Sequence, residues 1–148
     1  MGIKDLFVKK KISKEEMNHV QKLLKKCNDC ARIESTTMDI GEFYARYDEF
    51  ENTLTDLIAY EKYKIFSNML PSANLKYIRE NRVNDENALI RRTYQAVKAQ
   101  ADSAKSVEEK NRLYEDYFSS FDVYRGKMDS FNIEQLEELK KMSIKAED

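Results

Sequence analysis

Residues 106–126 read SVEEKNRLYEDYFSSFDVYRG, and this stretch indicates the fold class. Its first four residues form a capping box, because the Ser106 hydroxyl can accept a hydrogen bond from a free backbone amide while Glu109 reaches back. Apolar side chains then recur at spacings of one and three residues: Leu113, Tyr114, Tyr117, Phe118, Phe121 and Tyr124. That pattern follows the 3.6-residue turn of an α-helix, and Gly126 is placed to end it.

The same helical period governs the first half of the chain, and apolar alternation at period two is absent. A capping box at 13–16 opens a helix that we expect to run to about Ile33. A similar pattern at 39–42 opens a second helix. We expect this one to continue to Leu70, because Pro71 cannot extend it and restricts the residue before it.

A third helical region covers about 75–104, and a last helix begins near Asn132. The polar pair Asn84–Asp85 either interrupts the third region or lies in continuous helix. Short connections imply antiparallel neighbours. The sequence therefore predicts an all-α fold, a compact up-and-down bundle of about five helices with one long member over about 40–70. We expect a single helical domain over 1–148 with a basic leader at 1–12.

Composition supports a helical fold and limits the function classes. Three glycines and one proline in 148 residues are too few for a turn-rich β architecture. The 26 basic and 27 acidic residues give a net charge of −1, which argues against gripping nucleic acid with the whole surface. The charge is uneven: residues 1–26 hold eight lysines and residues 129–148 hold six acids. These ends either pair within or between chains or keep the protein soluble.

Candidate metal ligands are few. Cys27 and Cys30 form a CxxC, and the single histidine, His19, stands in an ExxH with Glu16. A tetrahedral zinc site needs four ligands, and a di-iron site needs a second ExxH that this sequence lacks. The thiols also follow a run of helix and miss the N-terminal field that activates redox cysteines. We interpret the cysteines as core side chains and His19 as a surface residue, and we expect no metal and no cofactor.

Catalytic motifs are missing as well. The sequence contains no GxSxG, no Gly-Lys phosphate loop, no GxGxxG and no EF-hand spacing. One histidine also limits Ser–His or Cys–His catalysis. No motif identifies a family, and we expect no enzymatic activity and no catalytic residues.

The aromatic residues are the most unusual part of the composition, with nine tyrosines, seven phenylalanines and no tryptophan. Most of them fall at core spacing. Tyr44, Tyr60, Tyr63 and Tyr77 fall off the main stripes. Tyrosine suits interfaces because it combines apolar area with a polar tip. These four residues are therefore the predicted interface candidates.

A modest basic cluster in the third region comprises Arg79, Arg82, Arg91, Arg92 and Lys98. Arginine near tyrosine can bind phosphate and stack on bases, which makes these residues nucleic-acid candidates. Ion pairing with nearby glutamates is the alternative explanation of the cluster.

The basic leader suggests a further possibility, since residues 3–12 mix lysines with apolar side chains that suit an anionic membrane surface. The leading hypothesis, however, is a non-catalytic helical interaction protein in the cytoplasm, which binds a protein partner or self-associates as a dimer. A nucleic-acid-associated accessory protein and a peripheral membrane protein are the two alternatives.

Overall fold

The computed structural model describes residues 11–144 of the chain. Within this range it contains six α-helices and two short 3-10 helices, and no strand. The prediction of an all-α fold is therefore confirmed. The chain divides into two compact units. The first holds the residues up to Thr36 together with Gly41–Glu80, and the second holds Thr37–Ile40 together with the residues from Asn81 onward. A single domain over 1–148 stays a prediction.

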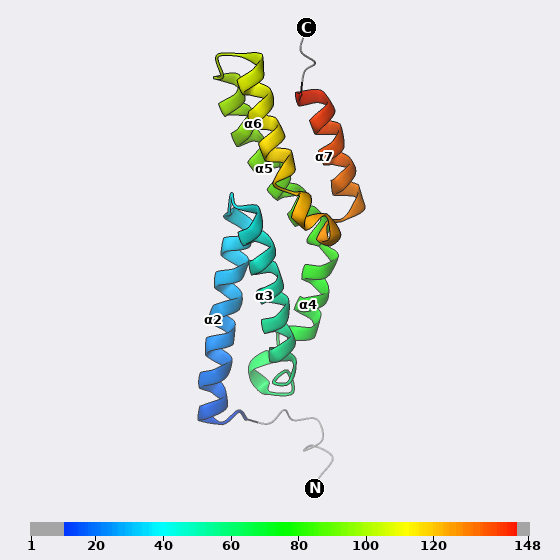
Figure 1. Ribbon diagram of the computed structural model, residues 1–148. Helices are drawn as coiled ribbons and strands as arrows, with labels where there is room; N and C mark the ends of the chain where they lie inside the picture. The colour runs from blue at the N-terminus through cyan, green and yellow to red at the C-terminus, as the bar shows by residue number, and fades with distance from the viewer. Residues whose placement is uncertain (1–10, 145–148) are drawn as a thin grey trace. The chain divides into compact units, whose positions relative to one another are not determined.

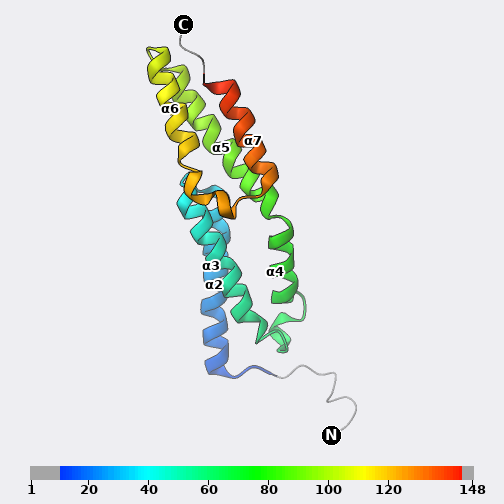
Figure 2. The ribbon, with the colours of Figure 1, turned by 45° about the vertical axis from the view of Figure 1, so that its right-hand side comes forward.

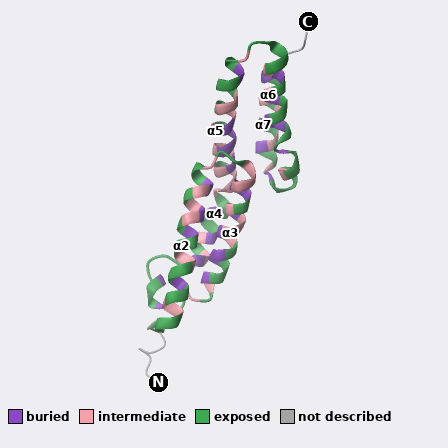
Figure 3. Cartoon of the chain, turned by 60° about the vertical axis from the view of Figure 1, so that its left-hand side comes forward, coloured by how far each residue is buried: buried purple, intermediate pink, exposed green. Residues whose placement is uncertain are grey.

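The first unit is built on two helices that lie side by side and run antiparallel, α2 (Lys14–Thr36) and α3 (Ile40–Ile58) (Figure 1). A short 3-10 helix, η1 (Lys64–Phe66), and then α4 (Pro71–Glu80) complete it. Its main cluster of buried residues comprises Val20, Cys27, Cys30, Phe50, Leu54, Leu57, Phe66, Leu75 and Ile78. These side chains recur on one side of each helix, as the helical period of the sequence predicts (Figure 3).

The second unit packs three α-helices together, α5 (Arg82–Asp102), α6 (Val107–Ser119) and α7 (Ser130–Ser143) (Figures 1 and 2). The 3-10 helix η2 (Asp122–Lys127) joins α6 to α7.

Aromatic side chains fill much of this second core. The hydroxyl of Tyr117 donates to the carbonyl oxygen of Ile90 at 3.0 Å and lies 2.8 Å from the Thr93 hydroxyl. Its ring meets Phe118 and Phe121 edge-on, at centroid distances of 5.1 and 5.3 Å. Burial raises the pKa of Tyr117 to about 12. Tyr117, Phe118 and Phe121 therefore form part of a core, in which the Tyr117 hydroxyl has hydrogen-bond partners.

The serine caps of two predicted capping boxes are confirmed. The Ser13 hydroxyl accepts from the backbone amide of Glu16 at 3.2 Å, and the Ser106 hydroxyl accepts from that of Glu109 at 3.1 Å. The Glu109 carboxylate reaches back to the amide of Lys105. Each box satisfies amides that the first helical turn leaves without a partner.

The prediction of one long helix over about 40–70 is wrong. The helix α3 ends at Ile58, and residues 59–70 form turns around η1. Pro71 does not end this helix but begins α4. Proline is well tolerated at a first helical position, because its missing amide would have no helical partner there.

Two further observations concern helix boundaries. One corrects a prediction, and the other settles a question that the sequence left open. The helix α6 ends at Ser119, so Gly126 does not terminate it and lies instead within η2. Asn84 and Asp85 do not break a helix, since both lie in the first turns of α5. The interruption comes at Asn81, between α4 and α5.

Candidate functional site

A polar groove of about 390 Å³ lies between α2 and α3 in the first unit. Its lining holds five basic and two acidic side chains together with two apolar ones. The residues are Lys22, Lys25, Lys26, Asp29, Cys30, Arg32, Ile33, Arg46 and Glu49. No other hollow described in the chain gathers as many cations from two helices.

One face of α2 supplies most of this lining. Within residues 22–33 its side chains recur at intervals of three and four, so they lie in line along the helix. The line extends for roughly 16 Å, at 1.5 Å per residue. It holds four cations, of which Lys22 and Arg32 mark the two ends. The groove therefore presents an elongated row of positive charge.

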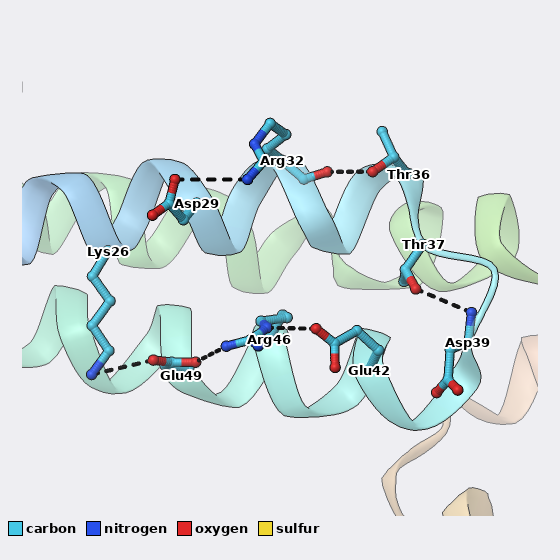
Figure 4. Close-up of polar contacts among 9 residues, drawn as sticks. All are labelled: Lys26, Asp29, Arg32, Thr36, Thr37, Asp39, Glu42, Arg46 and Glu49. Atoms are coloured by element: carbon cyan, nitrogen blue, oxygen red, sulfur yellow. Dashed lines mark hydrogen bonds and ion pairs between the residues drawn. The ribbon is translucent and has the colours of Figure 1, made fainter.

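The opposite wall comes from α3, where Glu49 sits between two cations (Figure 4). Its Oε1 lies 3.3 Å from Nζ of Lys26, across the groove, and its Oε2 accepts from Nη1 of Arg46 at 2.7 Å. Nε of Arg46 donates to Oε1 of Glu42 at 2.7 Å. Partial burial favours the neutral form of Glu49, but the hydrogen bonds and charges of Lys26 and Arg46 outweigh it and lower the pKa of this carboxyl.

The remaining cations differ in how far they are neutralised. Arg32 lies 3.8 Å from Asp29 of the preceding turn. Lys22 and Lys25 are exposed, and neither pairs with an acidic side chain among the residues that the structure describes. The part of the groove beside Lys22 and Lys25 is therefore open to an anion.

The floor of the groove is Cys30, which is buried. Burial, together with the charge of and a hydrogen bond with Glu49, raises the pKa of its thiol. Burial also raises the pKa of Cys27 to about 11, with the neighbouring Cys30 adding to the shift. Both cysteines are free thiols within the core, as we interpreted them from the sequence. Thiols held in the neutral form are poor nucleophiles and poor ligands.

His19 is exposed on α2, and its ring meets that of Tyr60 at 5.9 Å. Over residues 11–144, no three His, Cys, Asp or Glu side chains come together in a way that could hold a metal ion.

The predicted interface tyrosines separate into two kinds. Tyr44 is only 1% exposed and Tyr63 is also buried, so their placement off the core face was wrong. The reason for Tyr63 is the end of α3: the chain turns there, and the Tyr63 hydroxyl donates to Glu16 of α2 at 2.8 Å. Tyr60 is half-buried beside it, at 6.3 Å between ring centroids. Tyr77 is 63% exposed and keeps its place as a candidate.

The predicted nucleic-acid residues do not form a free cationic patch. Arg79 belongs to α4 and lies 3.6 Å from Glu51, whereas the other four belong to α5. Arg82 donates to the carbonyl oxygen of Lys127, Arg92 donates to that of Thr37, and Lys98 lies 3.2 Å from Asp102. Arg91 is exposed. Two members of the cluster, Arg82 and Arg92, therefore connect separate parts of the second unit.

The groove cations were missed as a site when the sequence was considered alone. The α2 lysines were counted only in the basic start of the chain, although their spacing of three and four places them on one face. No sequence pattern linked Arg46 and Glu49 to these lysines, because only the packing of α3 against α2 brings them to the same groove.

Comparisons with protein-family models, with curated proteins and with solved structures found no match. In the described range, no helix combines the length and the apolar character that a membrane span requires. The leader proposed for a membrane surface lies, for residues 1–10, outside the described residues.

Proposed function

We propose that this protein is a non-catalytic interaction protein whose α2–α3 groove binds an acidic segment of a partner protein. The single observation that carries the proposal is the row of cations along α2, in which Lys22 and Lys25 make no ion pair with an acidic side chain of the described residues. Surface lysines are common, but here they line a groove with a second helix as its wall. Complementary charge of this kind favours encounter and fixes orientation.

The length of the row favours an extended ligand over a small anion. Roughly 16 Å corresponds to about five residues of extended peptide or about three turns of helix. A free phosphate would contact only one end of such a row.

Mixed charge in the groove favours peptide over nucleic acid. Asp29 and Glu49 would repel a phosphate backbone, whereas they can accept hydrogen bonds from peptide amides. The lining also includes Cys30 and Ile33, which offer apolar contact to a side chain. The net charge of −1 adds no long-range attraction for nucleic acid. Binding of nucleic acid through Arg79, Arg82, Arg91, Arg92 and Lys98 stays a prediction, and so does self-association.

The proposal is tested by titrating the full chain with a fluorescent twelve-residue peptide of glutamate and leucine and measuring anisotropy. The double variant Lys22→Glu, Lys25→Glu should weaken binding by about tenfold or more, since it replaces two attractive contacts by repulsive ones. Both side chains are exposed, so the fold should be retained, as circular dichroism would show.

A matched control changes the same charge elsewhere. Lys105→Glu with Lys110→Glu, in the second unit, should leave peptide affinity within about twofold. Equal loss in both double variants would mean that only net charge matters, and the groove would not be the site. A single-stranded RNA of equal charge that binds more tightly than the peptide would instead favour the nucleic-acid alternative.

A further inference from the structure

The charges along the α2 wall of the groove are not all of one sign. Four lining residues follow one another at intervals of three, four and three, which places them in a single line on one face of the helix. They are Lys22, Lys25, Asp29 and Arg32. Their charges read positive, positive, negative, positive. Asp29 is thus an acid set between cations that lie about one helical turn away on either side.

Asp29 is only weakly neutralised by its own helix. Its side chain is 50% exposed, and its Oδ1 lies 3.8 Å from Nη2 of Arg32 (Figure 4). An exposed ion pair at this distance between residues of one helix contributes little to stability. The carboxylate therefore keeps most of its capacity to attract a basic group of a ligand, and it repels an acidic group placed opposite.

A second line of α2 residues lies closer to α3 and becomes apolar toward one end. Lys26 reaches across the groove to Glu49. Cys30 and Ile33 follow Lys26 at intervals of four and three, and they are buried and half-buried. The groove thus presents charge along its outer edge and apolar contact on its floor. This arrangement complements an amphipathic segment.

The spacing of the outer line favours a helical ligand over an extended one. Its gaps are about 4.5 and 6 Å along the axis of α2, which are the steps between residues three and four apart in any α-helix. Side chains on one face of a strand are about 6.7 Å apart, so a strand falls roughly 5 Å out of register over three gaps. A helix also uses its backbone amides internally, which leaves a basic side chain as the group that pairs with Asp29.

We propose that the groove selects an amphipathic helix whose acidic residues are interrupted by one basic residue, and that this basic residue pairs with Asp29. The acids on either side of it meet Lys25 and Arg32, and a further acid meets Lys22. The inference rests on the proposed function and adds its selectivity, because Asp29 determines the register in which the acidic segment binds.

The test compares fluorescent peptides of one composition and equal helix content, titrated with the full chain and followed by anisotropy. Their four charged residues are spaced by three, four and three. Two matched peptides read Glu-Glu-Lys-Glu or the reverse, since the ligand can run parallel or antiparallel to α2. The mismatched peptide reads Lys-Glu-Glu-Glu and places an acid opposite Asp29 in either direction. One matched peptide should bind about fivefold more tightly than the mismatched one.

A charge reversal ties this preference to Asp29. Asp29→Lys should abolish it, because each peptide then places its one lysine opposite a cation. Asp116→Lys makes the same change of charge at an exposed position of α6 and should retain the preference. A preference that survives Asp29→Lys would overturn the inference, as would equal binding of the three peptides to the natural chain. In that second case the groove would still bind acidic segments, whereas failure of all three to bind would also overturn the proposed function.

Discussion

Glu86 shows how one residue can stabilise a helix packing that its sequence position conceals. Its side chain is completely buried, and one oxygen, Oε1, accepts from the backbone amide of Asp129 at 3.0 Å and from Nδ2 of Asn132 at 2.8 Å. Asn132 in turn donates to the carbonyl oxygen of Val83. From the sequence, Glu86 is one of the glutamates that could form ion pairs with the arginines of the same helix. In the structure it fixes the start of α7 on α5.

We expect Glu86→Ala to lower the free energy of unfolding by about 3 kcal/mol, because it removes the shared acceptor of the Asp129 amide and the Asn132 side chain and opens a cavity. Glu86→Gln keeps an oxygen in place and should cost about 1 kcal/mol. Urea denaturation measures both. An exposed control on α7, Glu134→Ala, should change stability by less than about 0.5 kcal/mol. Equal stability of Glu86→Ala and the natural chain would show that the network is dispensable.

The buried thiol of Cys27 predicts a loss of stability in alkali. Its pKa is about 11 in the folded chain and 9.0 in its usual range, so the unfolded chain loses this proton first. The contribution of the protonated Cys27 thiol to the free energy of unfolding is therefore complete below about pH 9, and it is lost as the pH rises toward 11. Two pKa units correspond to about 3 kcal/mol in order of magnitude.

The measurement is urea denaturation at pH 8 and pH 11, compared between the natural chain and Cys27→Ala. The variant starts less stable at pH 8 because it loses packing, but its stability should fall less between the two pH values. An equal fall in both chains would assign the alkaline loss to other groups.

At the scale of the element, the turns at 59–70 hold the start of α4 in place. The Glu61 carboxylate accepts from the backbone amide of Ser72 at 3.1 Å. Ser72 follows Pro71 in the first turn of α4, where backbone amides lack helical partners. A side chain from the preceding turn thus acts as the cap that the helix does not carry itself.

Replacing Glu61 by alanine should destabilise the chain by about 1 kcal/mol, because it removes both the acceptor and a negative charge at a helix N-terminus. Thermal and urea unfolding would detect the change. Glu115→Ala, on the exposed side of α6, is the matched control and should be nearly neutral. If the two variants were equally stable, the contact to Ser72 would contribute nothing.

Several elements could be predicted from the sequence because their signals are local. Ser13 and Ser106 were identified as caps from the next three residues alone, and the helical period identified most core positions. The end of α3 was missed, because nothing between Ile58 and Pro71 is a strong helix breaker. It depends on Tyr63 and Phe66 packing inward after the chain turns, which is a tertiary effect. The groove was missed for a similar reason, since half of it comes from α3.

At the scale of the whole molecule, a net charge of −1 conceals how the charges are distributed. The surface as a whole has no excess of positive charge, yet five cations line one groove. Their field reaches a ligand only over the screening distance, which falls from about 30 Å at 10 mM ionic strength to about 8 Å at 150 mM.

Affinity for the acidic peptide should therefore fall at least tenfold or so across that range, because the row of about 16 Å acts as one unit only at low salt. Anisotropy titrations at each ionic strength measure it. The variant Lys22→Glu, Lys25→Glu should show a much shallower dependence. Affinity that is insensitive to salt would mean that apolar contact, rather than charge, dominates binding.

The position of Glu49 has a consequence for selectivity. This carboxylate already occupies the place between Lys26 and Arg46 that an incoming acid would need. A ligand with only one or two widely spaced acidic residues would gain little there, because it would compete with the Glu49 carboxylate for the same two cations. Glu49 has the same charge and, as part of the folded chain, loses no further chain entropy when it pairs with them. Only a segment with closely spaced acids can engage Lys22 and Lys25 and displace Glu49 together. If the groove binds an acidic segment as we propose, Glu49 would therefore set a threshold in the charge density of the ligands that can bind.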